Sequence, residues 1–121
     1  MKQLIDYDLI YAATPYSKYP PNIEQAFIDA CRIMARLVAL GIKVYSPIAH
    51  THPIAIHGGL NPLDHNLWIP FDHAIMGKSD ALLVVKMRGW DISYGVGEEI
   101  KFFQKHNKPI HYITPDTLVV T

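Results

Sequence analysis

Residues 89–100, Gly-Trp-Asp-Ile-Ser-Tyr-Gly-Val-Gly-Glu-Glu-Ile, carry the densest group of side chains that could do chemistry. They follow an apolar run at 81–85 and open a helical pattern, which predicts a junction between a strand and a helix. Gly95 and Gly97 would bring backbone N–H groups close to a ligand at the helix start, where Ser93 offers a hydroxyl group. Junctions of this kind bind ligands at the carboxyl edge of α/β sheets.

Two carboxylates, Glu98 and Glu99, fall in the first turn of this predicted helix. A carboxylate beside glycines that admit a substrate closely is a candidate nucleophile or general acid/base. Neighbouring helical residues lie about 100° apart around the axis, so only one of the two should face a pocket. The pattern also fits a plain N-cap with acidic residues that complement the helix dipole. The spacing alone leaves both interpretations open.

The composition narrows the class of protein. A chain of 121 residues, 50% of them hydrophobic, is expected to form one domain over residues 1–121 with one core. Its 11 basic and 11 acidic residues balance, which argues against a nucleic-acid polymer or a membrane surface as partner. There is no membrane-length apolar run or signal-peptide core, and Cys31 is the only cysteine. We therefore expect a cytoplasmic protein without disulfides or a thiolate metal cluster.

Apolar runs and helical spacings alternate along the chain, and this alternation predicts the fold class. We expect a three-layer α/β domain of the Rossmann or flavodoxin type, with a parallel sheet of four to five strands and helices on both faces. The expected strands are 8–13, 42–45, 81–86 and 109–113, with a short edge strand at 118–120, and the expected helices run between Asn22 and Gly41, over 70–77 and over 94–106.

Two loops separate these elements. The first, 14–21, contains three prolines, which forbid regular structure. The second, 48–66, is rich in His, Pro and Gly and is predicted as a long binding loop with room for short helical turns. Pro70 suits the first turn of the next helix. An earlier helix, kinked at Pro70, is the alternative.

The predicted topology brings two carboxylates together. Loops after the first three strands should meet at one edge of the sheet, since parallel strands all end there. The helix that contains Asp72 leads into the third strand and runs antiparallel to it, so Asp72 should lie near the same edge. Asp72 and Glu99 could then face one pocket. This is a minimum set for glycosidic bond cleavage, in which one carboxylate attacks the anomeric carbon and another group protonates the leaving group.

Three motifs carry a resemblance to a known family. They are Ile-Tyr-Ala-Ala-Thr-Pro-Tyr at 10–16, Asp72 followed eight residues later by Asp80 before an apolar run, and Ser93-x-Gly-Val-Gly-x-Glu99. In this order they resemble the nucleoside 2-deoxyribosyltransferase superfamily, in detail its small bacterial and phage relatives of undetermined function. They are similar also to the deoxynucleotide N-glycosidases. The third motif is the most specific.

The resemblance implies an enzyme that cleaves or transfers the N-glycosidic bond of a (deoxy)nucleoside or nucleoside 5′-monophosphate, with no cofactor and no metal. Glu99 would be the nucleophile that forms a glycosyl-enzyme intermediate, Asp72 would assist the departing base, and Tyr11 would orient Glu99 or the sugar. Pro15, in the opening loop, is expected to contact the substrate. Water as acceptor gives hydrolysis and a second base gives transfer, because both share the first half-reaction.

Ser93 departs from the transferases of the type class, which carry an acidic residue there, whereas the N-glycosidases carry serine. A serine and the amides of Gly95 and Gly97 at a helix start suit a 5′-phosphate, which a carboxylate would repel. This favours a nucleotide. Against it, Asp91 lies close, and Lys18 is the only basic residue of the first loop, where the N-glycosidases carry glycine and arginine.

Histidines and tryptophans can either pack or bind. His50 is expected to hydrogen-bond the substrate or to brace Asp72, because the histidine-rich loop lacks the partners of a zinc site. Trp90 follows a glycine in a loop and is expected to form a pocket wall. Trp68 stands on a helical pattern and is expected to pack. Asp80 is a candidate substrate-binding residue, with a structural acceptor of loop amides as the alternative.

Two further expectations concern the alternative function and the oligomeric state. The rival to an enzyme is a non-catalytic nucleotide-binding sensor of the same fold, because fold alone never proves activity. A homo-oligomer, at least a dimer, is expected because so small an apolar domain has more apolar surface than one sheet and three helices bury. The resemblance points the same way, and a partner chain could cover Tyr19, Trp68, Ile69 and Phe71.

Overall fold

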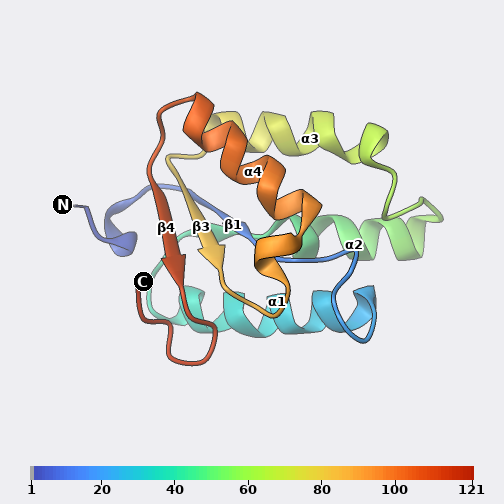
Figure 1. The fold of residues 1–121 in the computed structure, drawn as a ribbon, viewed down its shortest axis with the longest axis horizontal. Coiled ribbons are helices and arrows are strands. Elements are labelled where there is room, and N and C mark those ends of the chain that lie inside the picture. The colour runs from blue at the N-terminus through green and yellow to red at the C-terminus, as the bar shows by residue number, and fades with distance from the viewer. Residues whose placement is uncertain (1) are drawn as a thin grey trace.

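The computed structural model describes residues 2–121 and is built around one four-stranded parallel sheet (Figure 1). The strands lie in the order β2-β1-β3-β4, and β1 pairs in parallel with both β2 and β3. The predicted three-layer, Rossmann-like α/β fold is therefore confirmed. The strands are β1 (Ile10–Ala13), β2 (Val44–Tyr45), β3 (Ala81–Val85) and β4 (Ile110–Ile113).

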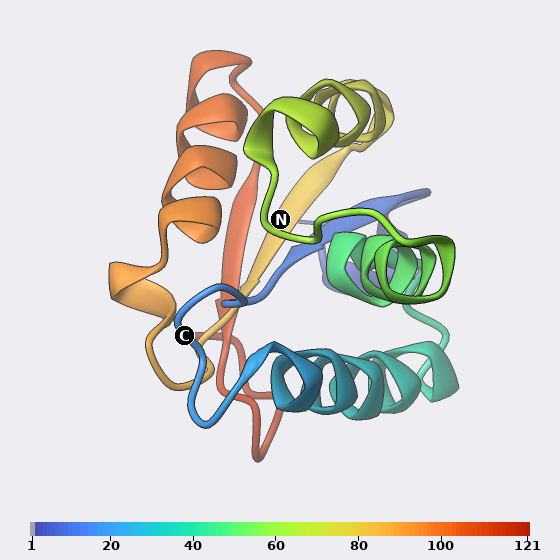
Figure 2. The ribbon, with the colours of Figure 1, turned by 90° about the vertical axis from the view of Figure 1, so that its right-hand side faces the viewer.

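Helices cover both faces of this sheet (Figure 2). α1 lies on one face, α3 and α4 lie on the other, and α2 packs against α1 and β1 beside the short strand β2. No helix of residues 2–121 is long and apolar enough to cross a membrane. The helices are α1 (Ile23–Ala39), α2 (Pro47–Gly58), α3 (His65–Lys78) and α4 (Tyr94–Lys105), with 3₁₀ turns η1 (Leu4–Asp6) and η2 (Trp90–Ile92).

The caps that the sequence predicts define α1 and α4. The Asn22 side chain accepts a hydrogen bond from the backbone N–H of Gln25, at 2.9 Å. The Ser93 hydroxyl oxygen accepts one from Val96 N–H, at 3.3 Å. Gly41 follows α1 with a φ of 84°, a conformation that favours glycine and ends the helix. The start of each helix is therefore set by the capping side chain that precedes it.

The prediction of a long loop over 48–66 was wrong, because most of this segment is helical. Ser46 caps α2 by accepting from the Ala49 N–H at 3.1 Å, and Pro47 occupies the first turn, where its missing donor is harmless. Pro53 lies inside the helix, and Gly59 ends it in the left-handed conformation. Strong caps thus override a helical interior that contains a proline and several histidines.

The helix predicted from Pro70 begins earlier, as the alternative stated. α3 starts at His65, with Pro70 in its interior. Its N-cap residue, Asp64, makes no side-chain cap, but its backbone oxygen accepts from Trp68 N–H at 3.2 Å. The expected edge strand at 118–120 is reduced to one antiparallel bridge between Val120 and Ile113.

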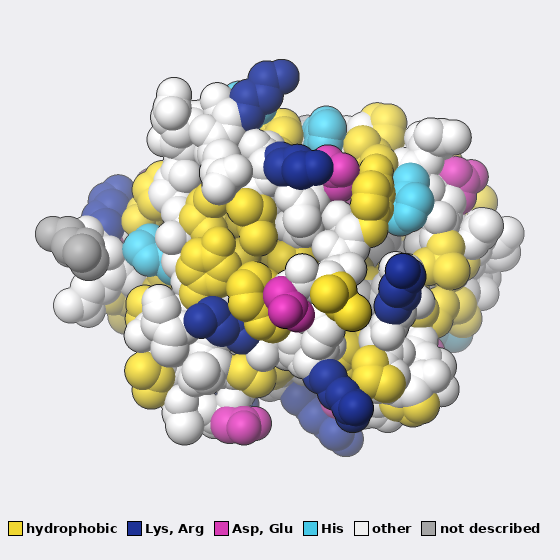
Figure 3. Space-filling model, viewed as in Figure 1, with side chains coloured by type: hydrophobic (Ala, Val, Ile, Leu, Met, Phe, Trp, Pro, Cys, Tyr) yellow, Lys and Arg dark blue, Asp and Glu magenta, His cyan; other side chains and the backbone are white. Residues whose placement is uncertain are grey.

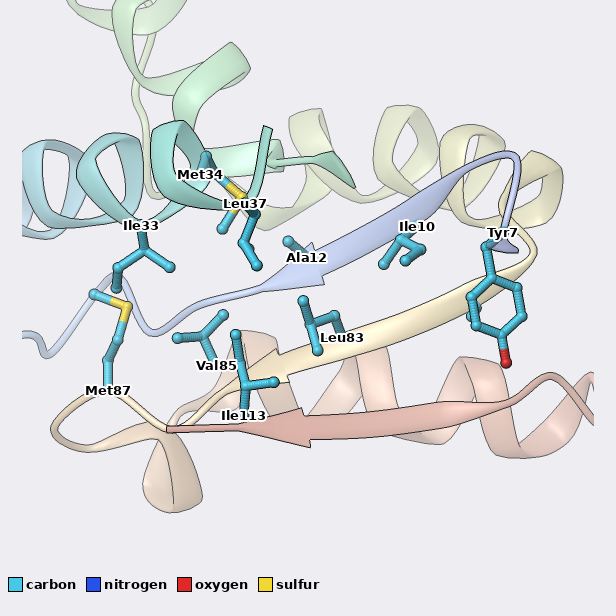
Figure 4. Close-up of a cluster of buried hydrophobic side chains, with 11 residues drawn as sticks. Tyr7, Ile10, Ala12, Ile33, Met34, Leu37, Leu83, Val85, Met87 and Ile113 are labelled. Atoms are coloured by element: carbon cyan, nitrogen blue, oxygen red, sulfur yellow. The ribbon is translucent and has the colours of Figure 1, made fainter. Parts of the chain in front are cut away.

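Two hydrophobic clusters hold the layers together. The first joins α1 to one face of the sheet, and Figure 4 shows Ile33, Met34 and Leu37 of α1 turned toward Leu83 and Val85 of β3. The second cluster lies under α3 and α4 on the opposite face. It is built from Tyr11, Ala13, Met76, Leu82, Val84, Val96 and Phe103.

The amino edge of the sheet is closed by paired polar groups. Asp80 accepts from Leu9 N–H at 3.0 Å through its carboxylate, and its own N–H donates to Leu9 O at 2.9 Å. Tyr7 and His111 share a hydrogen bond of 2.9 Å. The Lys108 ammonium donates to three carbonyl oxygens at the end of α3, those of Met76 (3.1 Å), Gly77 (2.9 Å) and Ser79 (2.7 Å).

Candidate active site

A hollow opens at the carboxyl edge of the sheet. Its walls come from the loop after β1, the start of α2, the segment before α3, the first half of α3 and the start of α4. Its volume is about 90 Å³, and a second hollow of about 170 Å³ adjoins it. The two have in common His65, Ile69, Asp72, Gly95 and Glu99, and so form one branched pocket.

The pocket brings together the two carboxylates that the topology predicts. Asp72 comes from the middle of α3 and Glu99 from the second turn of α4, and both line both hollows. Glu98 lines only the second hollow, and its carboxylate lies 3.8 Å from the Lys101 ammonium. Because Glu99 faces both parts of the pocket, the register of the helix favours it over Glu98 as the reactive carboxylate.

Tyr11 stands behind these carboxylates at the centre of the sheet. It is fully buried in β1, and its hydroxyl lies close enough to Glu99 to lower the pKa of that carboxyl group. The alignment is not that of a formed hydrogen bond, so the hydroxyl has no partner. Burial, then the charges of Glu99 and Asp72, raise the pKa of the Tyr11 hydroxyl far above its usual value. The Tyr11 hydroxyl therefore stays protonated and can donate a hydrogen bond toward this site.

Burial dominates the electrostatics of the carboxyl pair. It raises the pKa of Asp72 to about 6. It also raises the pKa of Glu99 well above its usual value, and the nearby Asp72 charge adds to that shift. Because the charge of Asp72 acts on Glu99, the two carboxyl groups titrate as a coupled pair, and burial favours the protonated form of each.

Four buried side-chain polar atoms of residues 2–121 have no hydrogen-bond partner, and they gather around this pocket. They are the hydroxyls of Tyr11, Thr14 and Tyr45 and one carboxylate oxygen of Asp72. Asp72 raises the pKa of Tyr45, after burial, to about 12, which shows that these two lie close together. Since buried polar atoms nearly always have partners, such a cluster marks a place built to receive polar groups.

The start of α4 contributes to the same pocket. Ser93 and Gly95 line it, and the Ser93 oxygen accepts from Val96 N–H as an N-cap. Gly97 lies further along the helix and lines neither hollow. The Ser93 hydroxyl proton is free to be donated to a ligand, because the cap uses only the oxygen lone pair.

The roles expected for the two tryptophans are exchanged. Trp68 lines the first hollow, and its indole N–H donates to Asn61 O at 2.9 Å. Trp90 lines neither hollow but packs edge-on against Tyr112, with ring centroids 5.7 Å apart and Lys86 over both rings. Both rings pack against the second hydrophobic cluster. Figure 3 shows hydrophobic side chains gathered over the region where β4 and α4 lie in Figure 1. The prediction of Trp90 as a pocket wall was wrong, because a partner far along the chain captures it.

Three further candidates lie outside the pocket walls. His50 is exposed, stacks on Phe71 at 5.2 Å between ring centroids and lines neither hollow. Pro15 is buried between Thr14 and Tyr16, which do line the hollow. Asp80 lies at the opposite edge of the sheet, where its carboxylate accepts from Leu9 N–H, which is the structural role stated as its alternative.

The structure adds residues that the sequence did not single out. Tyr16, Ser17 and Thr51 line the first hollow, and His65 lines both. Tyr16 closes the opening motif at 10–16, so its position in that loop was an available signal. Ser17 lies in the predicted loop at 14–21, whereas Thr51 and His65 come from the segment 48–66, whose helices were not predicted. No group of three or more His, Cys, Asp or Glu side chains among residues 2–121 is arranged to hold a metal ion.

Comparison with known proteins adds a family assignment. A family model described as a domain of unknown function, DUF1937, matches residues 8–114. The chain belongs to the DUF1937 family. The match begins just before β1 and ends just after β4, so this family definition includes the whole sheet together with Tyr11, Asp72 and Glu99. A comparison with curated proteins finds no match.

Proposed function

We propose that the protein cleaves or transfers the N-glycosidic bond of a (deoxy)nucleoside or nucleoside 5′-monophosphate, through a covalent intermediate on Glu99. The observation that carries the proposal is the meeting of Asp72, Glu99 and Tyr11 in one pocket surrounded by unpartnered polar atoms. The resemblance to nucleoside 2-deoxyribosyltransferases supplies the reaction class. The geometry supports it because a nucleophile and an acid must both reach the same anomeric carbon and its leaving group.

The raised pKa values of both carboxyl groups suggest how the roles divide. Glu99 must be ionised to attack, although burial favours its protonated form. Transfer of that proton to Asp72, whose pKa is about 6, would leave a nucleophile on α4 and an acid on α3. The Tyr11 hydroxyl would then complete its hydrogen bond to the Glu99 carboxylate. Glu99 forms a bond to the anomeric carbon as the bond to the base breaks, and Asp72 delivers its proton to the departing base.

The lining of the pocket bears on the substrate. No lysine or arginine lines either hollow, while the carboxylates of Asp72, Glu98 and Glu99 do, which favours an uncharged nucleoside. A 5′-phosphate would depend on the Ser93 hydroxyl and the first amides of α4. Replacing Ser93 with Asp should therefore weaken binding of a monophosphate far more than binding of the nucleoside. Similar losses for both ligands in calorimetry would reject a phosphate-binding role for Ser93.

The deciding experiment is incubation of the protein with a panel of deoxynucleosides and their 5′-monophosphates, with chromatography of the released base. Addition of a second free base separates transfer from hydrolysis. Base release that depends on Glu99 supports the proposal. Tight binding without base release would instead favour the rival function, a nucleotide-binding sensor of the same fold.

We further propose that the working unit is a homo-oligomer. The two hollows are smaller than a usual ligand site, and the exposed Leu63 lines the first of them. Leu67 and Phe71 are exposed on α3, next in sequence to the lining residues Trp68 and Asp72. A second copy seated there would complete the walls. Of the other expected contacts, Trp68 and Ile69 line the hollow, whereas Tyr19 donates to Asp29 within its own chain at 2.7 Å. A monomeric mass by light scattering, with full activity on dilution, would defeat this proposal.

A further inference from the structure

Three polar side chains from separate segments meet behind the wall of the first hollow. The Tyr16 hydroxyl is hydrogen-bonded with Nδ1 of His52, and Nε2 of the same ring lies 2.8 Å from a carboxylate oxygen of Glu24. His52 is 2% exposed, whereas the Glu24 side chain is 60% exposed. The bonds therefore run from solvent, through a buried ring, to a residue that lines the pocket.

Aromatic contacts fix the orientation of this ring. Phe27 stacks on His52 with 4.6 Å between ring centroids, and Tyr16 meets it edge-on at 83°. Each ring nitrogen has one partner, and neither the Tyr16 hydroxyl nor the ring makes another hydrogen bond within residues 2–121. None of these three residues has a role in the proposed bond cleavage, so a buried, oriented histidine remains to be explained.

The proton positions follow from what each atom can donate. An ionised carboxylate only accepts, so the proton between Glu24 and His52 sits on Nε2. A neutral imidazole carries one proton, so Nδ1 accepts and the Tyr16 hydroxyl donates to it. The single Tyr16 proton is then committed to His52. What the Tyr16 oxygen can still offer a ligand is a lone pair.

We propose that Glu24 and His52 are positioning residues that make Tyr16 a dedicated hydrogen-bond acceptor for a sugar hydroxyl group of the ligand. The nature of the ligand rests on the proposed function, whereas the direction of the Tyr16–His52 bond does not. A free tyrosine hydroxyl would bind donors and acceptors alike. A tyrosine held in this way selects a hydroxyl or amino group and disfavours a carbonyl or phosphate oxygen at the same place.

Nitrogen-15 NMR of the His52 ring at pH 7.5 tests the bond direction. We expect a protonated Nε2 and an unprotonated Nδ1. Glu24→Ala removes the acceptor and should mix the two tautomers, whereas the matched variant Glu24→Gln keeps an amide oxygen that accepts from Nε2 and should preserve them. Both variants change an exposed side chain, so folding is not at risk. A doubly protonated ring, or a proton on Nδ1, in the unaltered protein would overturn the proposal.

Calorimetry tests the ligand group, with Glu99→Gln present in every protein so that the ligand stays intact. The probes are 2′-deoxyadenosine, 2′,3′-dideoxyadenosine and 2′,5′-dideoxyadenosine. Tyr16→Phe should weaken binding of 2′-deoxyadenosine about three- to tenfold, the worth of one neutral hydrogen bond. One dideoxy analogue should already show this loss and suffer none further from Tyr16→Phe.

The outcomes separate this proposal from the proposed function. Equal losses from Tyr16→Phe with all three probes, or no loss with any, would overturn the Tyr16 assignment while base release by the unaltered protein still stands. Binding that follows the expected pattern without any base release would support Tyr16 and overturn the enzyme. Absence of binding with all three probes would overturn the sugar as ligand.

Discussion

The two edges of the sheet differ in the hydrogen bonding of their buried polar groups. At the amino edge, Asp80 and Leu9 pair reciprocally, and the Lys108 ammonium occupies the free carbonyl groups at the end of α3. At the carboxyl edge, hydroxyls of Tyr11 and Thr14 and an oxygen of Asp72 are buried without partners. Satisfied polar groups stabilise the folded state, whereas unsatisfied ones subtract from its stability.

This difference favours the carboxyl edge as the binding edge, in agreement with the proposed function. A cluster of unpartnered polar atoms beside two desolvated carboxyl groups lowers stability and persists only where it has a use. The amino edge has no comparable cluster within residues 2–121. We therefore expect substitutions at the amino edge to change stability alone, and substitutions at the carboxyl edge to change activity while leaving stability intact or improved.

The largest effect is expected at the reactive carboxylate. Glu99→Gln should lower base release by about a thousandfold or more, because an amide cannot form the covalent bond. Glu98→Gln, one residue away, should retain activity within a few-fold. Mass spectrometry of the unaltered protein with substrate should detect a glycosyl adduct that Glu99→Gln lacks. Comparable losses at both positions would remove Glu99 as the nucleophile.

The next effect concerns the amino edge. Lys108→Met leaves the carbonyl groups of Met76, Gly77 and Ser79 without their shared donor and should reduce the free energy of unfolding by about 1–3 kcal/mol. Base release per folded molecule should not change. Lys105→Met, an exposed lysine for which no hydrogen bond is found, is the control, and urea denaturation measures both. A loss of activity without a loss of stability would break the distinction between the edges.

A third effect is a pH dependence of stability that comes from Asp72. Its pKa is about 6 in the folded protein against 3.8 for a fully solvated aspartate side chain, so between these values the folded state binds more protons than the unfolded state. Stability should then fall as pH rises from about 4 through 6. Asp72→Asn should remove about 1–2 kcal/mol of this fall, with allowance for partial solvation of the group.

Denaturation curves at pH 4, 5, 6 and 7 measure this slope. Exposed Asp91→Asn provides the control for a general loss of negative charge. Glu99, whose pKa is raised in the same direction, contributes to the slope that remains in Asp72→Asn. Identical slopes in Asp72→Asn and the unaltered protein would contradict the burial of the Asp72 charge.

The smallest effect compares two threonines. Thr14→Val removes a buried hydroxyl without a partner and should stabilise the protein by about 0.5–1 kcal/mol. Thr51→Val removes a hydroxyl that donates to Pro47 O at 2.8 Å and should not stabilise it. Both residues line the same hollow, so thermal unfolding of the pair isolates the effect of the missing partner. A gain from Thr51→Val as large as that from Thr14→Val would contradict this account.

Features that depend on residues close in the sequence, such as helix caps, could be predicted, and contacts between distant segments could not. The caps at Asn22 and Ser93 depend on residues three positions away, so they could be predicted together with α1 and α4. The parallel order of strands allowed Asp72 and Glu99 to be placed at one edge. Ser46 and Pro47 start α2 by the same local rules, but the interior proline and histidines hid the helix that follows.

What the sequence could not reveal depends on partners far along the chain. Trp90 and Trp68 differ in role because Trp90 packs against Tyr112, whereas Trp68 lines the first hollow. The bonds among Tyr16, Glu24 and His52 join three segments with no common spacing, so no pattern predicts them. The mispredictions therefore fall at tertiary contacts, where burial is decided by the whole fold.

The contacts of the last segment also determine when folding can finish. Lys108 completes the end of α3, His111 bonds to Tyr7 at the other end of the chain, and Arg36 donates to the carbonyl oxygens of Pro115 and Asp116. During synthesis, none of these contacts can form until the final strand has left the ribosome. A chain arrested before β4 would leave β3 as an unpaired edge strand on the side where β4 binds. Completion of the sheet therefore awaits β4, the last of the described strands to be synthesised, because its parallel pairing joins segments that are far apart in the chain.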